Sequence, residues 1–340
     1  MTTHLPSTMQ VSVLHKARDL RNEERAVPTP APREVLVRVR AVGVCGSDTH
    51  YYTDGRIGDF TVDQPLILGH EASGEIVAVG DGVDPARIGE RVSMEPGIPT
   101  AFSHETLTGN YNLDPSVQFF ATPPVDGTFA EYVTHPAAFT YAVPDTVSLT
   151  AAAMLEPLSV AIAATQSAHI GLGSHVLIAG AGPIGLLTAA VARLRGATRV
   201  HVFDVREERL STAEQYGAHR AMLANEVNTA HDRYHAFIDA TGATPAITTG
   251  IACLGPRGTA VLVGMGADTV PLPLSLIQGR EISVTGTFRY RNTWPTAVEL
   301  ASAQAIDLDG LITSRFPLAQ AEEALLAGAQ PGQIKALVEP

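Results

Sequence analysis

The sequence predicts an α/β protein built from a β-rich domain and a second domain with a doubly wound parallel sheet. Its 340 residues are enough for two hydrophobic cores. Short stretches with alternating apolar residues dominate the first half, whereas strands and helices alternate from about Pro157 onward. A glycine-rich GxGxxG sequence lies between a strand and a helix of the second half, as in dinucleotide-binding folds.

The elements expected in the first half are strands. Val35–Val44 reads VLVRVRAVGV, and its alternating apolar residues are typical of a half-buried strand. Gly74–Gly80 and Arg91–Met94 show a similar pattern, with glycine and proline recurring between these segments. This spacing favours a β-rich domain over a helical bundle.

The elements expected in the second half alternate between strand and helix, which indicates a parallel sheet covered on both faces. We predict strands at Ser174–Ala179, Val200–Val205, Ala236–Ala240, Thr259–Val263 and Glu281–Thr285, and helices at Pro183–Arg195 and Glu207–Tyr216. Further helices are expected after Pro295 and over Leu318–Ala327. A final strand at Ile334–Val338 is expected to return to the first domain. The apolar run Thr259–Gly266 could supply an edge strand that pairs between subunits.

Composition excludes several classes of protein. The formal net charge of −12 makes nucleic acid and anionic membranes poor partners. Lys16 and Lys335 are the only lysines, which we attribute to genome composition. Two cysteines form no disulfide framework, and no leader is visible, so we expect a soluble cytoplasmic protein. The most apolar stretch, Val176–Ala192, is interrupted by glycine and proline, which argues against a membrane span.

The glycine-rich segment Gly180–Gly185 predicts a dinucleotide site. Gly180 permits the tight turn, Gly182 lets the backbone approach a pyrophosphate, and Gly185 allows close packing of helix and strand. Asp204 follows Gly185 by nineteen residues, where a carboxylate accepts the ribose hydroxyls and repels a 2′-phosphate. NAD is therefore favoured, although Arg206 and Arg209 leave NADP open.

Four residues are candidate metal ligands, namely Cys45, His70, Glu71 and Glu156. Taken singly, such residues are more often a buried hydrophobe, a structural histidine or solvated carboxylates. Their settings favour a site, because Cys45 follows a strand and His70 follows Gly69. We expect both segments to be turns that expose side chains to a cleft rather than to a core.

These segments resemble the zinc-dependent medium-chain dehydrogenases, in particular their sorbitol and xylitol dehydrogenase branch. The resemblance extends from about Val11 to the end of the chain and implies a GroES-like catalytic domain and a Rossmann domain. The first would comprise residues 1–157 and 287–340 and the second residues 158–286. Its motifs are VGVCGSDTHYY, LGHEASGEIVAVG, GNYNLDPSVQFFATPPVDGTFAEYV, MLEPLSV, GAGPIG and TGTFRYRNTWP.

The resemblance also implies a role for each matching residue. Cys45, His70 and Glu71 would bind zinc, and Glu156 would touch a water on that zinc. Ser47 and His50 would relay the proton, although Glu156 offers another path that the sequence leaves open. The polyol pocket would contain Tyr51, Phe119, Thr122, Glu156, Arg289 and Tyr290. The cofactor would contact Gly180, Gly182, Pro183, Ile184, Gly185, Asp204, Arg209, Val263, Gly264, Met265, Thr287, Phe288 and Arg289.

One feature departs from many relatives, which carry four cysteines around a structural zinc. The corresponding segment here, Glu95–Phe120, contains none, so we predict one zinc per chain, held by the catalytic ligands. The remaining Cys253 is expected to be a buried helix residue. Arg289 follows the last strand of the sheet near the expected interdomain cleft, where it could donate to several hydroxyls. The alternative is a surface salt bridge.

The predicted activity is NAD-dependent oxidation of a secondary alcohol of a sorbitol-like or xylitol-like polyol to a ketose. A cyclitol, aminocyclitol or sugar-acid dehydrogenase would use the same chemistry. A simple alcohol or threonine dehydrogenase would leave the polyol-branch segments unexplained, and a zinc-free quinone reductase would lack the zinc ligands. A non-catalytic NAD-binding regulator is a further alternative. We also expect a homo-oligomer, either a tetramer or a dimer.

Overall fold

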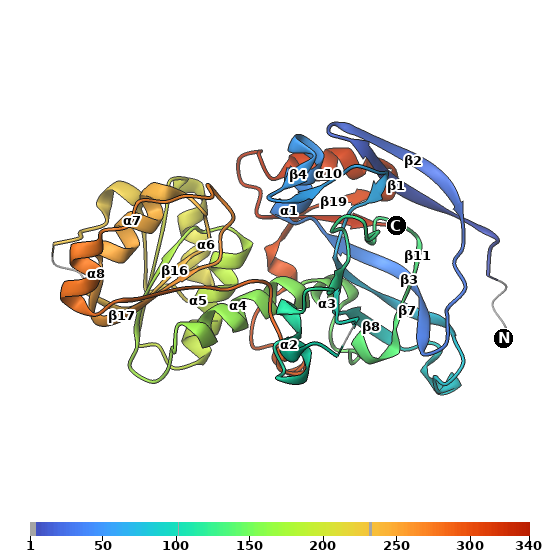
Figure 1. Ribbon diagram of the computed structural model, residues 1–340, viewed down its shortest axis with the longest axis horizontal. Coiled ribbons are helices and arrows are strands. Elements are labelled where there is room, and N and C mark those ends of the chain that lie inside the picture. The colour runs from blue at the N-terminus through green and yellow to red at the C-terminus, as the bar shows by residue number, and fades with distance from the viewer. Residues whose placement is uncertain (1–4, 101, 231–232) are drawn as a thin grey trace. The chain divides into compact units, whose positions relative to one another are not determined.

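The computed structural model describes residues 5–100, 102–230 and 233–340, and it contains two compact units (Figure 1). The β-rich unit comprises Met1–Glu156 and Trp294–Pro340, and the parallel-sheet unit comprises Pro157–Thr293. The first unit is therefore made from both ends of the chain, and the second is inserted between them.

A seven-stranded sheet forms the centre of the β-rich unit. Its order is β12 (Thr140–Ala142), β8 (Arg91–Met94), β7 (Glu71–Val79), β3 (Glu34–Gly43), β20 (Lys335–Glu339) and β19 (Ile312–Pro317), with β11 (Tyr132–Pro136) also pairing with β3. The predicted C-terminal strand is confirmed, and it pairs antiparallel to β3 with Leu337 opposite Gly43. This pairing brings the end of the chain beside β3 and β7.

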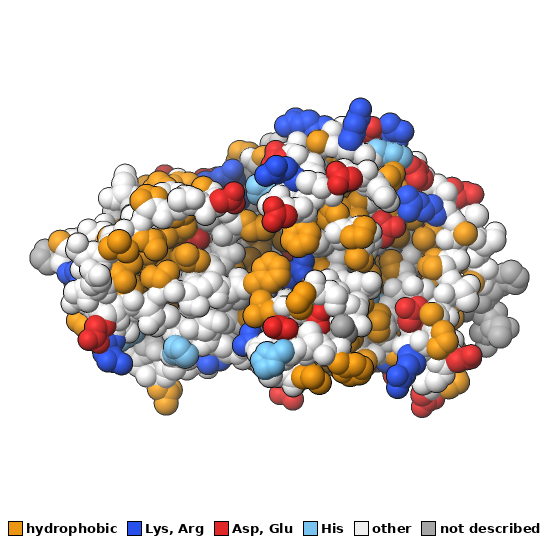
Figure 2. Space-filling view, viewed as in Figure 1, with side chains coloured by type: hydrophobic (Ala, Val, Ile, Leu, Met, Phe, Trp, Pro, Cys, Tyr) orange, Lys and Arg blue, Asp and Glu red, His pale blue; other side chains and the backbone are white. Residues whose placement is uncertain are grey.

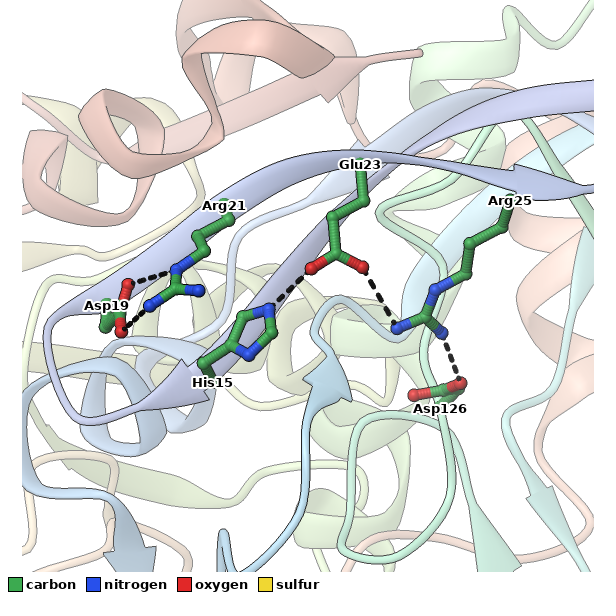
Figure 3. A network of polar contacts seen from close by, with 6 residues as sticks. All are labelled: His15, Asp19, Arg21, Glu23, Arg25 and Asp126. Carbon is green, nitrogen blue, oxygen red and sulfur yellow. Dashed lines mark hydrogen bonds and ion pairs between the residues drawn. The ribbon is translucent and has the colours of Figure 1, made fainter.

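The described part of this unit contains three smaller sheets as well. They are β2 (Asp19–Ala26), β1 (Thr8–Lys16) and β6 (Leu66–Ile67); β4 (Arg56–Ile57) with β5 (Phe60–Thr61); and β9 (Gly97–Ile98) with β10 (Gln118–Phe119). A polar network follows the β1–β2 hairpin, in which Glu23 contacts His15 and Arg25, and Arg25 reaches Asp126 (Figure 3). Charged side chains on an edge strand such as β2 discourage pairing with other chains.

Short helices complete the β-rich unit. They are α1 (Gly46–Asp54), α2 (His104–Leu107), α3 (Leu149–Ala153), α9 (Trp294–Ser302) and α10 (Ala321–Ala327). Helix α1 is anchored to α10, because Thr49 Oγ1 donates to the Leu325 carbonyl at 3.1 Å and the Tyr52 hydroxyl donates to Glu322. The unit boundary falls within α4 (Leu155–Ser167).

The parallel-sheet unit contains a six-stranded sheet whose neighbouring strands all run parallel. Its order is β15 (Arg220–Leu223), β14 (Arg199–Asp204), β13 (His175–Ala179), β16 (Tyr234–Asp239), β17 (Leu254–Leu262) and β18 (Ser283–Gly286). This is the 3-2-1-4-5-6 order of the Rossmann fold, which binds ligands where the order reverses. Besides most of α4, the unit contains the helices α5 (Pro183–Leu194), α6 (Leu210–Gln215), α7 (Thr244–Ala252) and α8 (Leu274–Arg280). The predicted fold class is confirmed.

The expected edge strand at Thr259–Gly266 is wrong. Its first half, Thr259–Leu262, belongs to β17, which lies between β16 and β18 and therefore has no free edge, and Val263–Gly266 follow the end of that strand. A continuous apolar run is typical of an interior parallel strand, since both of its faces are covered. Within the residues that the structure describes, no helix is both long and apolar enough to cross a bilayer.

Candidate zinc and dinucleotide sites

Three of the predicted metal ligands lie together in the β-rich unit. The ligand atoms of Cys45, His70 and Glu71 all lie within 4.8 Å of one another. Cys45 is the N-cap residue of α1, and Glu71 is the first residue of β7, directly opposite Gly43 at the end of β3. The antiparallel pairing of β3 and β7 therefore brings two segments distant in sequence to one point.

His70 and Glu71 differ in setting from the exposed turn that we expected. They are 6% and 1% exposed, whereas Cys45 is half-buried, and Glu71 is already the first residue of β7. Room for the carboxylate comes from Gly43, where an added Cβ would lie 2.0 Å from Glu71 Oε2. A side chain at position 43 would occupy the space that the Glu71 carboxylate needs.

Asp48 is a site residue that the sequence analysis missed. Its fully buried carboxylate accepts the Cys45 N–H at 3.0 Å and the Gly69 N–H at 2.9 Å, and lies 3.5 Å from His70 Nδ1. Burial alone would raise the pKa of Asp48, but the His70 charge and these donors lower it. A carboxylate on Nδ1 leaves Nε2 of the imidazole to a metal, a frequent arrangement for metal-binding histidines.

The segment that leads to His70 is fixed by a neighbouring loop. Asp126 Oδ1 accepts the Ile67 N–H at 2.8 Å, and the Thr128 N–H donates to the Gly69 carbonyl at 2.8 Å. Asp126 is in turn paired with Arg25 of the polar network (Figure 3). The network on the β1–β2 hairpin therefore contributes to the placement of a metal ligand.

Lys335 is the second site residue that the sequence analysis missed. It lies at the start of β20, is 3% exposed, and places its Nζ 2.6 Å from Glu71 Oε1 and 2.5 Å from Glu71 Oε2. Burial alone would lower the pKa of Lys335, but the charges of Glu71, Cys45 and Glu156 raise it. The ammonium is thus charged within the ligand cluster.

The donor set suits zinc. Thiolate, imidazole and carboxylate are the three side-chain ligands that zinc prefers, and three protein ligands are typical of catalytic zinc. Glu71 Oε2 is buried and, among the described residues, has an ion-pair neighbour in Lys335 but no hydrogen-bond partner. A cation bound at this point would be coordinated by the Oε2 atom of Glu71.

The other site residues predicted for the β-rich unit differ in how far they are buried. His50 lies on α1 with its side chain 52% exposed and Nδ1 3.3 Å from Asp54, whereas Tyr51 on the same helix is buried. The Phe119 ring centroid lies 5.5 Å from that of His70. Glu156 is 5% exposed but falls outside the three-ligand group. Ser47, also on α1, and Thr122, bridged to Val125, complete the predicted set.

Hydrogen bonds stabilise the cysteine-free lobe between Glu95 and Phe120. Glu95 accepts the Tyr111 hydroxyl at 2.6 Å and the Tyr141 hydroxyl at 3.1 Å. Asp114 accepts the Ser103 and Ser116 hydroxyls, each at 2.7 Å. Two carboxylates, those of Glu95 and Asp114, thus organise this lobe.

The glycine-rich segment of the parallel-sheet unit has the predicted geometry. It runs from the end of β13 into α5, and an added Cβ at Gly185 would lie 1.8 Å from the Gly180 carbonyl oxygen. Asp204, at the end of β14, accepts the Ala181 N–H at 2.6 Å and the Arg206 N–H at 2.9 Å. Arg209 lies beside Gly182, where an added Cβ would be 3.7 Å from its Nη1.

The remaining predicted cofactor residues lie after β17 and β18. Val263 and Gly264 donate their N–H groups to the Asp239 carbonyl, and Met265 follows with 47% of its surface exposed. The Thr287 N–H donates to the Leu262 carbonyl at 3.0 Å. These segments therefore follow the carboxyl ends of strands, where Rossmann folds bind their ligands. Pro183 and Ile184 are the first two residues of α5.

Arg289 has an unusual backbone conformation. Its φ is 56°, in the left-handed region that disfavours most side chains, and its guanidinium lies 4.7 Å from the Phe288 ring centroid. Tyr290 beside it is 3% exposed. Cys253, expected within a helix, is the fully buried C-cap residue of α7.

Comparison with known protein families gives one match in the first half of the chain and one in the second. Residues 31–145 match the alcohol dehydrogenase GroES-like domain, and residues 183–303 match the zinc-binding dehydrogenase family. The fold and the ligand group thus define a zinc-dependent medium-chain dehydrogenase, and the chain belongs to that superfamily.

Similarity to individual proteins identifies the branch of this superfamily. The sorbitol dehydrogenase of Gallus gallus is 42% identical over 92% of this chain and 91% of its own length. L-idonate 5-dehydrogenase of Escherichia coli superposes with a TM-score of 0.93, at 27% identity and 98% coverage of both chains. A short chain alcohol dehydrogenase of E. coli CFT073, complexed with NADH, superposes with a TM-score of 0.92, at 28% identity, covering 98% of this chain and 100% of its own. Within the superfamily, the chain belongs to the polyol dehydrogenase branch.

Proposed function

We propose that this protein is a zinc- and NAD-dependent dehydrogenase that oxidises a secondary hydroxyl of a linear, sorbitol-like or xylitol-like polyol to a ketone. The group formed by Cys45, His70 and Glu71 is the observation that carries the proposal. It occurs in a chain 42% identical to a sorbitol dehydrogenase over 92% of its length.

Cys45, His70 and Glu71 would hold the zinc, whose chemistry is to withdraw electrons from a substrate oxygen and so ease its deprotonation. Ser47 and His50 follow Cys45 on α1, and the exposed side of the His50 imidazole suits the solvent end of a proton path. Glu156 offers a second path, since it is buried and its charge acts on Lys335 beside the ligands. Tyr51, Phe119, Thr122, Arg289 and Tyr290 are the residues that we propose to contact the substrate.

The parallel-sheet unit would hold the dinucleotide, which supplies a hydride acceptor. The turn Gly180–Gly185 at the start of α5 suits a pyrophosphate, because the N–H groups of a helix N-terminus attract anions. Both oxygens of Asp204 accept a backbone N–H and retain lone pairs for ribose hydroxyls. This carboxylate favours NAD, while Arg206 and Arg209 are the groups that would admit NADP.

A dehydrogenase for cyclitols, aminocyclitols or sugar acids is the second candidate. The structural similarity to L-idonate 5-dehydrogenase favours a sugar-acid substrate. The sequence identity to that enzyme is 27%, however, and the identity to sorbitol dehydrogenase is 42%, which favours the polyol. A carboxylate substrate would also need a cationic partner, for which Arg289 is the available residue in the predicted set.

NAD reduction over a substrate panel, before and after chelation, tests the proposal. The panel comprises sorbitol, xylitol, ribitol, arabitols, galactitol, inositols, L-idonate and simple secondary alcohols. Chelator-sensitive activity on linear polyols is the expected result. Activity confined to inositols or to L-idonate would support the second candidate, and bound zinc without any activity would support a regulator.

We propose further that the protein is a cytoplasmic homo-oligomer, a dimer or a tetramer. The acidic composition and the pair of unbridged cysteines support the cytoplasm. Within the described residues β18 is an end strand of its sheet, so it offers an edge for pairing between subunits in place of the interior β17. Light scattering on a sizing column would give the mass, and a monomer at micromolar concentration would contradict the assembly.

A further inference from the structure

Lys335 occupies a position where a cation is unusual. Its side chain is 3% exposed, and lysines are almost never buried unless they are paired. Both oxygens of Glu71 lie within 2.6 Å of its Nζ, so the ammonium and a zinc ligand form one unit. Neither the metal-binding motifs nor the proposed proton path uses this residue.

The chemical type of the residue at position 335 is also an exception. The chain has 23 basic residues, of which only Lys16 and Lys335 are lysines, and Lys16 is exposed. The surroundings of Lys335 are tightly packed, since an added Cβ on Gly43 would lie 3.0 Å from Lys335 Cε and 2.0 Å from Glu71 Oε2. A compact ammonium fits beside the carboxylate, whereas a planar guanidinium needs more room.

The charges around this ammonium suit a shared ligand. Glu71 contacts Lys335 directly, and the charges of Glu71, Cys45 and Glu156 raise the pKa of Lys335. Lys335 and the zinc would attract the same carboxylate while repelling each other, since both are positive.

We propose that Lys335 is a positioning residue that holds the Glu71 carboxylate and shares it with the zinc, which weakens zinc binding and leaves the metal more electron-poor. The proposal rests on the zinc part of the proposed function and not on the identity of the polyol. A carboxylate that also neutralises an ammonium donates less charge to a metal. A zinc ion held in this way would withdraw more electron density from the substrate oxygen.

Zinc affinity measured without substrate tests this role. We would prepare Lys335→Met, which removes the charge and the donors, and Lys335→Gln, which keeps a hydrogen-bond donor for Glu71. Lys16→Met is the matched control, because Lys16 is the only other lysine of the chain and its side chain is exposed. Each metal-free protein is titrated with zinc against a fluorescent chelator at pH 8.

We expect the zinc Kd to fall about tenfold in both Lys335 variants and to stay unchanged in Lys16→Met. At saturating zinc, kcat should fall while KM for the polyol changes less, because the substrate contacts are intact. The zinc-dependent rise in Tm should be larger in Lys335→Gln than in the wild type, since the metal-free variant has lost its compensating cation.

A lysine whose only effect was to keep Glu71 in place, without competing with zinc for its charge, would give the opposite result. Glu71 would then lose its placement, and zinc would bind more weakly in both variants. Unchanged or weaker zinc binding in a folded Lys335→Gln overturns the inference, whatever the behaviour of Lys335→Met. If the wild type binds zinc but oxidises no polyol, the substrate proposal fails and this inference stands. If the wild type binds no zinc, both fail.

Discussion

The carboxylate of Asp48 lies 3.5 Å from Nδ1 of His70 and joins the two chain segments that supply the metal ligands. It accepts the N–H of Cys45 on one oxygen and that of Gly69 on the other. One fully buried side chain thereby fixes the start of α1, the turn before β7 and the orientation of an imidazole.

Replacing this carboxylate by an amide should loosen the metal site. We expect Asp48→Asn to raise the zinc Kd by about 10- to 100-fold, the usual cost of losing an outer partner of a ligand. The exposed Asp59→Asn is the control. Chelator competition gives both constants, and a Kd equal to that of the wild type would show that Asp48 serves only the backbone.

The zinc site should also require glycine at position 43, because glycine has no side chain. In Gly43→Ala, the new Cβ would meet Glu71 Oε2 at 2.0 Å, so the carboxylate must leave its position. We expect a purified protein with less than about a tenth of the wild-type zinc content, because one of three ligands is displaced.

Gly46→Ala is the matched control for that substitution. An added Cβ at position 46 meets nothing within 4 Å, and we expect its zinc content and Tm to match the wild type. Metal analysis by mass spectrometry reports the content of both variants. Full zinc occupancy in folded Gly43→Ala would contradict the assignment of Glu71 as a ligand.

Asp204 should determine the choice of dinucleotide. We expect Asp204→Ser to raise KM for NAD by about tenfold, since the ribose loses a charged hydrogen-bond acceptor. The same change should improve kcat/KM for NADP, because the carboxylate no longer repels the 2′-phosphate and Arg206 is close. Initial rates with both cofactors measure the ratio, and Glu214→Gln on α6 serves as control. A ratio that does not move would locate the discrimination elsewhere.

Arg289 should affect polyols more than simple alcohols. A guanidinium can donate to several hydroxyls of an extended substrate, so we expect Arg289→Ala to raise KM for polyols by about tenfold. KM for a secondary alcohol with one hydroxyl should change little. The exposed neighbour Arg291 gives the control variant Arg291→Ala. Equal losses on both substrates would refute a role in polyol binding.

Asp48 and Lys335, the two site residues that the sequence analysis missed, show which roles a local sequence pattern does not predict. Strands such as β3 and the turn at Gly180–Gly185 follow from periodicity and glycine spacing, which are properties of a short window. Lys335 is 264 residues away from Glu71, and only the pairing of β20 with β3 brings the two together. Asp48 stands within a recognised motif, but its partner Gly69 lies 21 residues further on. Such roles depend on long-range register, which one sequence does not reveal.

A buried histidine in the β-rich unit should make stability depend on pH. His135 on β11 is 1% exposed, and its Nε2 lies 2.8 Å from the Glu95 carbonyl oxygen, to which it donates. Burial lowers the pKa of His135 from 6.5 to about 4. The unfolded chain therefore binds a proton between these values that the folded chain does not bind, and stability falls as the pH falls from 6.5 to 4.

The loss over that window should approach about 3 kcal/mol for this residue. His135→Gln retains an N–H donor for the Glu95 carbonyl but does not titrate, so its unfolding free energy should change less with pH. Urea unfolding of metal-free protein at pH 6.5, 5.5 and 4.5, with the exposed His104→Gln as control, measures the difference. Parallel pH profiles for wild type and His135→Gln would mean that His135 does not contribute to the acid sensitivity of the fold.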